Sequence, residues 1–226
     1  MGEIMVTAIA AESEFDGTSR AEYAYQMLLD AIREQRVEPG ERVREEDVSR
    51  MLGISRTPVR QAMHRLQTRG LLVQASGRGL LVAELGRPQV IELYAMRELL
   101  EGAAARLAAQ HAGPSDIIAM RHVLEEFRKA APNPRKLARI NRMFHATIHE
   151  AAHNRYLSQS LDDFSDTLAL LRGTTFSLKG RWKGELAENV ELVDAIERRD
   201  SDAAETAARK NMRTALDVRL RMLFGA

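Results

Sequence analysis

The sequence predicts a mainly α-helical protein with two parts: an N-terminal winged helix-turn-helix with a small β-hairpin wing, and a C-terminal antiparallel bundle of six or seven helices. Three observations predict this fold class. Apolar residues recur at helical spacing through most of the 226 residues. Two short apolar strands flank a glycine-rich turn within residues 71–82. After Gly86-Arg87-Pro88 the pattern is helical throughout, with short breaks.

The break at Gly86-Arg87-Pro88 also divides the chain. Residues 1–18 hold small and acidic residues without a clear period, which is typical of a flexible tail. We expect the winged helix in residues 19–86 and the all-helical domain in residues 87–226. Both segments are long enough for small domains.

The composition excludes several classes of protein. The chain has no cysteine, so it cannot form a disulfide framework, a thiolate metal site or a cysteine nucleophile. No apolar run approaches the roughly 20 residues of a membrane span, and the N-terminus lacks the features of a signal peptide. We therefore expect a cytoplasmic protein that does not interact with a membrane.

Three helices are predicted within the winged helix. The first spans about Arg20–Arg36 and ends at the turn Pro39-Gly40. The second, Glu45–Leu52, is followed by Gly53, which suits the left-handed position after a helix. The third spans Arg56–Arg69 and follows the second after a short turn.

A good N-cap opens the third helix and a hairpin follows it. Ser55 is a favourable N-cap, and Pro58 falls in the first turn, where a missing N–H has no helical partner. Two strands then flank the turn 76–79, and we expect the first of them to pair with a short strand near residues 42–44. Helix, helix, tight turn, helix and hairpin, in this order, make a winged helix.

Six helices are predicted in the second domain, separated by breaks that contain Gly, Pro or Asn. Short connections favour antiparallel neighbours and hence a bundle. The predicted helices span about Gln89–His111, Ser115–Ala130, Arg135–His153, Tyr156–Thr174, Lys183–Arg199 and Asp202–Phe224.

The third helix of the winged helix lies in a basic block. Between Arg50 and Leu80 there are six arginines and no acidic residue, although the net charge of the chain is only +1. Such a block suits phosphate binding, and Arg and Gln can form paired hydrogen bonds to guanine and adenine. A solvated arginine face is the alternative. The expected DNA contacts are Arg56, Thr57, Arg60, Gln61 and Arg65 on the helix and Arg78 at the wing tip.

The run PGERVREEDVSRMLGISRTPVRQAMHRLQTRGLLVQASGRGLLV resembles the DNA-binding domain of GntR-type bacterial repressors. The SRTPVR core and the following RGLL are its most specific elements. Some members of the fatty-acid-responsive branch have a DNA-contacting Arg where this chain has Glu46, so the preferred DNA sequence should differ from theirs. The contacts with a double-stranded operator that the resemblance implies are Ser55, Arg56, Thr57 and Arg60, with Gly79 at the wing.

Three later stretches resemble the FCD-type effector domain of the FadR branch. They are RELLEGAAARLAA, NRMFHATIHEAAHNRYL and ENVELVDAIERRDSDAAETAARKNM. The resemblance implies that residues 87–226 bind a small-molecule effector and form a homodimer.

Polar side chains lie on the apolar stripes of four predicted bundle helices. A buried amide or guanidinium without a partner is costly, so these groups should meet one another, water or a ligand. A satisfied polar network is the alternative to an effector pocket. The inward polar residues are Arg97, Asn141, His145, Asn189 and Asn211.

Many FCD domains hold a divalent metal through one Asp and three His, and the resemblance maps these positions to Asn141, His145, Asn189 and Asn211. Amides are weak ligands for zinc- or nickel-like ions, so a tightly bound metal is not expected and no cofactor is required. His149 and His153 continue the row from His145 at four-residue steps and could rescue a metal site, but we expect them at the surface or at a helix end.

Arg97 is the fixed charge of this polar set. Its guanidinium suits a carboxylate, so the predicted effector is a small organic acid. Glu101 lies one helical turn from Arg97 and is the competing partner for its charge.

These features predict a ligand-responsive regulator, most often a repressor, that binds a palindromic DNA operator as a homodimer. An enzyme is one rival, but no nucleophile motif or phosphate loop supports it, and His145 has no clear carboxylate partner. The other rival is an architectural DNA-binding dimer without an effector, whose DNA binding would be salt-sensitive and weakly selective.

Overall fold

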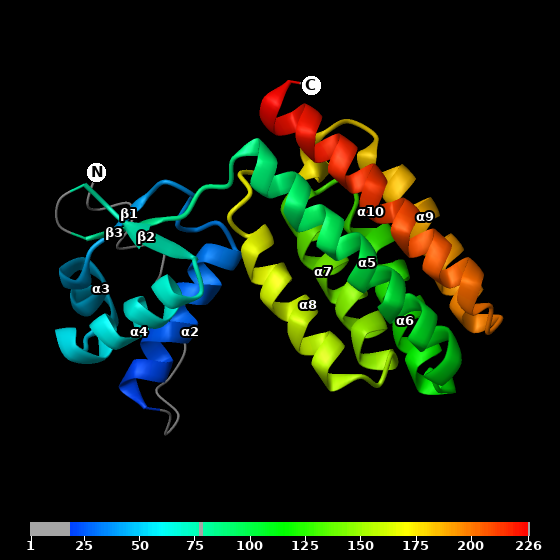
Figure 1. Cartoon of the computed structure of the whole chain (residues 1–226), viewed down its shortest axis with the longest axis horizontal. Helices are drawn as coiled ribbons and strands as arrows, with labels where there is room; N and C mark the ends of the chain where they lie inside the picture. The colour runs from blue at the N-terminus through cyan, green and yellow to red at the C-terminus, as the bar shows by residue number, and fades with distance from the viewer. Residues whose placement is uncertain (1–18, 77–78, 226) are drawn as a thin grey trace. The chain divides into compact units, whose positions relative to one another are not determined.

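The computed structural model describes residues 19–76 and 79–225, which form two compact units (Figure 1). The first unit contains the described residues up to Leu85 together with Asp166–Arg172. The second contains Gly86–Ser165 and the described residues from Gly173 onward. The predicted tail, residues 1–18, and Arg78 at the wing tip lie outside the described residues.

The three predicted helices of the winged helix are confirmed. Their apolar faces pack on one another, and Leu28, Val59 and Leu66 are fully buried between them. Ser55 occupies the N-cap of the third helix in extended conformation, but its side chain accepts no capping hydrogen bond. The helices are α2 (Arg20–Arg33), α3 (Glu45–Leu52) and α4 (Arg56–Thr68).

The wing is part of a three-stranded antiparallel sheet made of β1 (Arg42–Val43), β2 (Leu72–Gln74) and β3 (Leu80–Val82), in the order β1-β3-β2. The prediction that the first wing strand pairs with residues 42–44 is wrong, because β3 lies in the middle and pairs with both. Hydrogen bonds from Gly40 N to Val82 O (2.8 Å) and from Val82 N to Glu41 O (2.9 Å) bring the chain before β1 alongside β3.

Two glycines meet backbone requirements in this unit. Gly53 follows α3 with a φ of 65°, as predicted for the left-handed position after a helix. Gly79 has a φ of 100°, and a Cβ there would lie 3.0 Å from the carbonyl oxygen of Val43. A side chain at residue 79 would therefore push the hairpin away from β1.

Residues 166–172 complete the first unit, although the periodicity assigns them to a bundle helix ending at Thr174. The helix α8 (Arg155–Leu168) ends earlier. Asp166 is 2% exposed and binds Arg33 Nε at 2.5 Å and Arg69 Nη2 at 2.8 Å. Leu170 packs in the same apolar cluster as α2 and α4. These contacts join residues far apart in the sequence, which a helical period does not reveal.

Asp166→Ala should lower the free energy of unfolding of the winged-helix unit by about 1.5–3 kcal/mol, because hydrogen bonds between charged groups contribute in this range. Both arginines keep some contact with water, which limits the loss. Circular dichroism during urea unfolding measures it. Asp162→Ala, which removes an exposed acid one turn earlier in α8, is the control and should change stability by less than about 0.5 kcal/mol.

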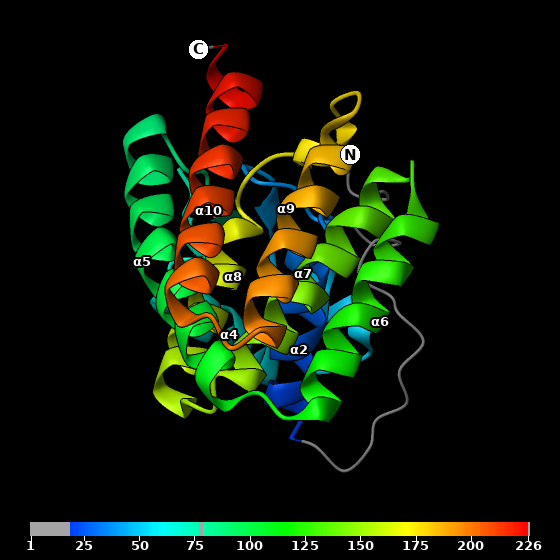
Figure 2. The same ribbon diagram turned by 90° about the vertical axis from the view of Figure 1, so that its right-hand side faces the viewer.

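The second unit confirms the predicted helical bundle. Its long helices lie side by side in both views (Figures 1 and 2). Alanines 104, 105 and 108 are fully buried and allow a close approach between α5 and α10. No helix in residues 19–76 and 79–225 combines the length and apolar character needed to cross a membrane. The bundle helices are α5 (Arg87–His111), α6 (Pro114–Ala130), α7 (Pro134–Ala151), most of α8, α9 (Arg181–Glu197) and α10 (Ser201–Phe224).

Candidate nucleic-acid interface and polar core

One face of α4 is exposed and polar. Val59, Ala62, Met63 and Leu66 face the core, which turns the side chains between them toward solvent. The second helix of a helix-turn-helix directs its N-terminal residues at the edges of bases, and α4 holds this position after α3. The predicted contact residues that this face exposes are Ser55, Arg56, Thr57, Arg60, Gln61 and Arg65.

Two arginines of this face pair with α3. Arg60 donates from Nε and Nη2 to the two carboxylate oxygens of Glu45, each at 2.9 Å. Arg56 Nη1 lies 3.1 Å from Glu46 Oε1. The hydrogen bond from Arg60 lowers the pKa of Glu45, so this carboxylate stays charged. The sequence pattern did not predict these pairs, because the acids lie outside the basic block.

Arg65 differs from Arg56 and Arg60 because it is bound to α2. Its Nη1 lies 2.5 Å from Glu22 Oε2, and its guanidinium carbon is 3.9 Å from the ring centre of Tyr25. The side chain is therefore held against α2 by an ion pair and a cation–π contact. Any contact between Arg65 and DNA has to compete with this anchoring.

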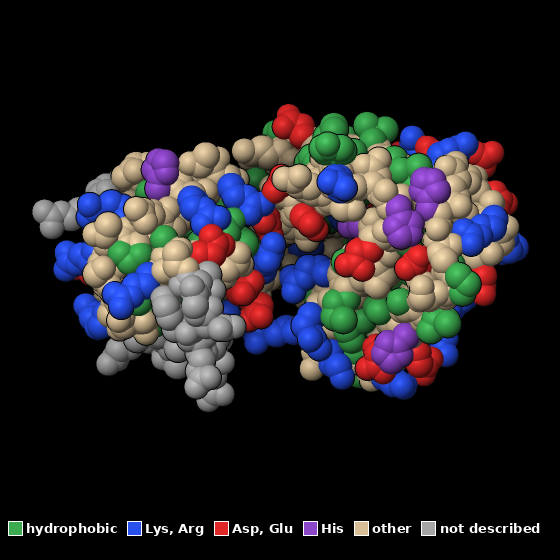
Figure 3. Space-filling view, turned by 90° about the horizontal axis from the view of Figure 1, so that it is seen from below, with side chains coloured by type: hydrophobic (Ala, Val, Ile, Leu, Met, Phe, Trp, Pro, Cys, Tyr) green, Lys and Arg blue, Asp and Glu red, His purple; other side chains and the backbone are tan. Residues whose placement is uncertain are grey.

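A hollow of about 880 Å³ lies between α4, α3 and the sheet. Arg42, Arg44, Arg56 and Arg60 line it, together with Glu45 and Glu46. Figure 3 shows that acidic and basic side chains alternate on the face it draws, without a single basic field. The hollow where the recognition helix and the wing strands meet therefore carries four arginines and two glutamates.

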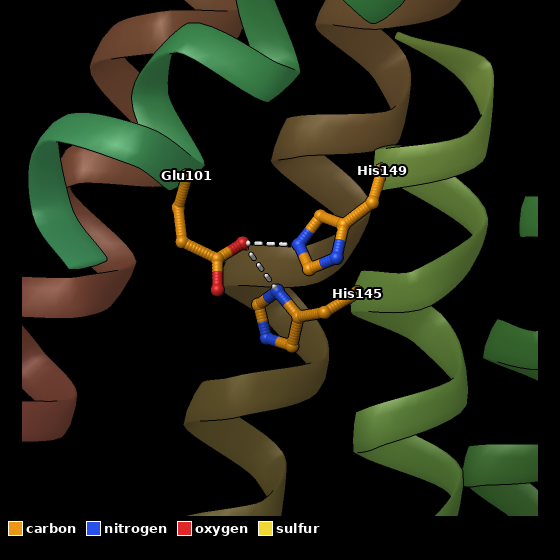
Figure 4. A group of neighbouring side chains, drawn as sticks. All are labelled: Glu101, His145 and His149. Carbon is orange, nitrogen blue, oxygen red and sulfur yellow. Dashed lines mark hydrogen bonds and ion pairs between the residues drawn. The ribbon is translucent and has the colours of Figure 1, made fainter. Parts of the chain in front are cut away.

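The polar core of the bundle contains two clusters, and the first is centred on Glu101 (Figure 4). Arg97 Nη2 donates to Glu101 Oε1 at 2.7 Å. The other carboxylate oxygen, Oε2, lies 2.9 Å from His149 Nε2 and 3.2 Å from His145 Nδ1. Helix α5 contributes Arg97 and Glu101, whereas both histidines project from neighbouring turns of α7.

The Glu101 carboxylate is charged although it is buried. Burial raises its pKa, but the charges of His145 and Arg97, with hydrogen bonds from His145 and His149, hold the pKa well below its usual value. Glu101 therefore neutralises Arg97, which was the competing possibility for this guanidinium. It is also the carboxylate partner of His145 that the sequence pattern had not revealed.

His149 lies in the last turn of α7, as one half of the expectation has it, but it is not at the surface. His149 is 8% exposed and belongs to the Glu101 cluster. Helix α7 continues to Ala151 and places His149 one turn from His145 on the inward face. His153 is exposed, as expected, and lies 3.7 Å from Asp116.

The second cluster is a chain of amides that ends at charged groups. Asn189 Nδ2 donates to Asn141 Oδ1 at 3.2 Å, and Asn211 Nδ2 lies 3.4 Å from Asn189 Oδ1. The same Asn211 nitrogen donates to Glu185 Oε1 at 3.2 Å and to Glu188 Oε2 at 3.0 Å. Burial, followed by the charge of Glu185, raises the pKa of Glu188.

Arg181 binds the two acids of this cluster. It forms a hydrogen bond with Glu185 and lies 3.7 Å from Glu188. Arg181 Nε and Asn211 Oδ1 are buried and have no hydrogen-bond partner among the described residues. Only the nitrogen of the Asn211 amide can donate to the two carboxylates, so its oxygen has to point elsewhere. An unpaired donor and an unpaired acceptor are thus present in the same cluster.

The residues at the metal positions of the FCD family do not fit a divalent metal. Three of the four positions are amides, and Asn141, Asn189 and Asn211 are linked by hydrogen bonds to one another. Amide oxygens suit hard ions better than zinc-like ions, and none of these side chains carries a charge. His145, the one imidazole at these positions, turns its Nδ1 toward Glu101.

The sequence pattern identified the inward polar residues of the bundle and Glu101 as a partner of Arg97, but it missed the charged partners of the amides. Glu185 lies four residues before Asn189, and Arg181 lies four residues before Glu185, so all three share a face of α9. That spacing was a usable signal. Charged residues are usually exposed, which made an outward position the default expectation.

A winged helix with arginines on its exposed third helix, followed by a helical domain with a polar core, defines a DNA-binding transcriptional regulator. The chain belongs to the GntR family of bacterial regulatory proteins, which it matches over residues 20–82, and it carries an FCD domain over residues 92–214. FCD domains bind small-molecule effectors, so the bundle is the effector domain.

Individual relatives agree with this assignment. The chain is 28% identical over 183 residues to the uncharacterized HTH-type transcriptional regulator YdhC of Bacillus subtilis, covering 80% of this chain and 82% of that protein. It is 27% identical over 187 residues to the Glc operon transcriptional activator of Escherichia coli, covering 72% and 74%. The solved structure of E. coli McbR/YncC has a TM-score of 0.81 at 20% identity, covering 91% and 99%, and shows the same fold.

Proposed function

We propose that this regulator is a homodimeric repressor that binds a palindromic operator and responds to a small organic acid in the bundle. One recognition helix reads few base pairs, so two copies related by a two-fold axis supply the remaining specificity. Because its target is DNA, the proposed function places the protein in the cytoplasm. A related protein is an activator of the Glc operon. That this chain represses transcription rather than activates it is therefore part of the proposal.

The observation that carries this proposal is the polar core of the bundle. Helices α5, α7, α9 and α10 all contribute buried polar groups to it. Two of these groups, Arg181 Nε and Asn211 Oδ1, lack a partner among the described residues. Leaving a buried donor or acceptor unpaired is unfavourable. A polar molecule that forms hydrogen bonds with both groups would remove this cost, and its binding would be favoured.

An acid is favoured because Arg97 retains donors. A guanidinium has five N–H groups, and Arg97 uses one of them in its hydrogen bond to Glu101, while its guanidinium carbon lies 5.4 Å from the ring centre of Tyr94. The carboxylate of a bound acid can accept two parallel hydrogen bonds from the remaining N–H groups of a guanidinium. We propose that Arg97 holds the acid and that four further polar residues of the bundle fix its orientation: Asn141, His145, Asn189 and Asn211.

A thermal-shift screen of organic acids tests the effector class. An acid present at about 100 times its dissociation constant should stabilise the folded protein by about 2.7 kcal/mol and raise its melting temperature. The same acid should change operator affinity, measured by fluorescence anisotropy. The corresponding neutral amide, which lacks the carboxylate, should have neither effect.

A paired set of variants locates the acid. Arg97→Met should abolish the thermal shift, but this change leaves Glu101 without its guanidinium. The double variant Arg97→Met/Glu101→Gln removes both charges and should also give no shift while it still binds operator DNA. An undiminished shift in the double variant would place the effector elsewhere in the bundle. An operator affinity that no organic acid changes would favour the architectural alternative.

A further inference from the structure

Three side chains in the bundle direct one metal-ligating atom each to a common point. They are Glu101 Oε2, His145 Nδ1 and His149 Nε2, and all three atoms lie within 4.8 Å of one another (Figure 4). All three residues are buried, with exposures between 4% and 8%. Such convergence of one carboxylate and two imidazoles is the composition of many transition-metal sites.

Two of the three separations, those from Glu101 to each histidine, suit ligands of one ion. Zinc binds imidazole nitrogens and carboxylate oxygens at about 2.0–2.2 Å, so neighbouring ligands of one ion lie about 2.9–3.5 Å apart. Glu101 Oε2 is 2.9 Å from His149 Nε2 and 3.2 Å from His145 Nδ1. The two histidines are four residues apart on α7, a spacing that places both on one face of a helix.

We infer that Glu101, His145 and His149 form a binding site for a divalent transition metal of the zinc class. This ligand set shares only His145 with the family positions, and the other three family positions hold amides. The expectation that the chain does not bind a metal tightly followed from those amides. That expectation discounted His149 as a residue of the surface or of a helix end and did not include Glu101, and the fold brings both to His145.

Arg97 has a positioning role in this site. It binds Oε1 of Glu101 at 2.7 Å and so leaves Oε2 directed at the histidines. Groups that orient a ligand in this way are common around metal sites. Its positive charge opposes that of the ion, so we expect a weaker site than a zinc centre with four protein ligands. Three protein ligands also leave a coordination position open.

A network of hydrogen bonds is the competing explanation. Two histidines that donate protons to Glu101 would give the same contacts without an ion. The two explanations differ in what happens when zinc is added, because a metal replaces the protons at His145 Nδ1 and His149 Nε2. The test uses Zn²⁺ without any organic acid, so its outcome is separate from that of the effector proposal.

The experiment is zinc titration of the full-length protein after treatment with EDTA and dialysis. Isothermal titration calorimetry should show about one equivalent bound by the wild type. His149→Gln should weaken binding by at least about 10–100-fold, the range that even loss of an orienting group can cause. The matched control is His153→Gln, which removes an exposed histidine just beyond the end of α7 and should bind zinc like the wild type.

A second measurement does not depend on the folding of a variant. Histidine ring signals in the NMR spectrum of the wild type should shift for His145 and His149 on addition of zinc, whereas His153 should be unaffected. Absence of zinc binding by the folded wild type would overturn the inference, as would unchanged binding in folded His149→Gln. An equal loss of affinity in Asn189→Ala and His149→Gln would also overturn it, because it would place the ion at the family positions.

Discussion

An Arg56→Ala/Arg60→Ala double variant should bind operator DNA about 2–6 kcal/mol more weakly than the wild type, because each arginine that contacts a base contributes about 1–3 kcal/mol. Both side chains lie in the exposed N-terminal half of α4 and are more than half exposed. Neither contributes to the apolar core, so the winged helix should keep its fold and its circular dichroism spectrum.

Fluorescence anisotropy with an operator selected by the wild type from random DNA measures the loss. Arg128→Ala is the matched control, because it removes the same charge from an exposed position of α6 in the bundle and should change operator affinity little. The salt dependence separates two kinds of contact, since loss of a phosphate contact lowers the slope by about one and weakens binding to all sequences alike. Wild-type affinity in the double variant would refute the assignment of α4.

The ion pairs with α3 bear on how these arginines read DNA. Glu45 holds Arg60 through two parallel hydrogen bonds, which fixes the orientation of the guanidinium before DNA arrives. Glu46 takes the place of a DNA-contacting arginine in some relatives and here pairs with Arg56. Both acids also repel phosphates. The expected consequence is lower affinity for DNA in general and sharper selection of sites where both arginines meet guanines.

Local sequence signals were sufficient to predict the winged helix. The apolar spacing of α2 and α4, Gly53 after α3 and the glycine-rich hairpin each act within a few residues. The pairing of β1 with β3 could not be predicted in this way, since both wing strands are short and apolar and either could lie in the middle. Asp166 was also beyond reach, because its partners Arg33 and Arg69 are about 100 residues or more away in the sequence.

The candidate site was predicted in part for a similar reason. Helical periodicity places Arg97 and His145 inward, and both are buried. Periodicity says nothing of which helices face each other, so it could not show that Glu101 meets the α7 histidines. Glu185 was not expected in the core because it is charged. It can be buried because it pairs with Arg181 one turn away, and the attraction between the two charges offsets the cost of desolvation.

Glu101→Gln should be among the most destabilising single substitutions in the bundle. It leaves the buried guanidinium of Arg97 without an opposite charge, and breaking a buried pair in this way costs about 3–5 kcal/mol. Urea unfolding measures the effect, with the fluorescence of Trp182, the single tryptophan of the chain, as a probe within α9. EDTA in every sample excludes any contribution from bound metal.

Two further variants test whether the loss of stability comes from an unpaired buried charge. Glu98→Gln breaks the ion pair with Arg213 one turn earlier on the same helix, but Arg213 is 64% exposed, so the loss should stay below about 1 kcal/mol. Arg97→Met/Glu101→Gln should recover much of the stability lost in Glu101→Gln, because removal of both charges leaves neither one buried alone. A loss below about 1 kcal/mol in Glu101→Gln would show that water reaches Arg97 in solution and replaces Glu101 as its partner. The same bundle would then be open enough for a ligand to reach the guanidinium without displacing the glutamate.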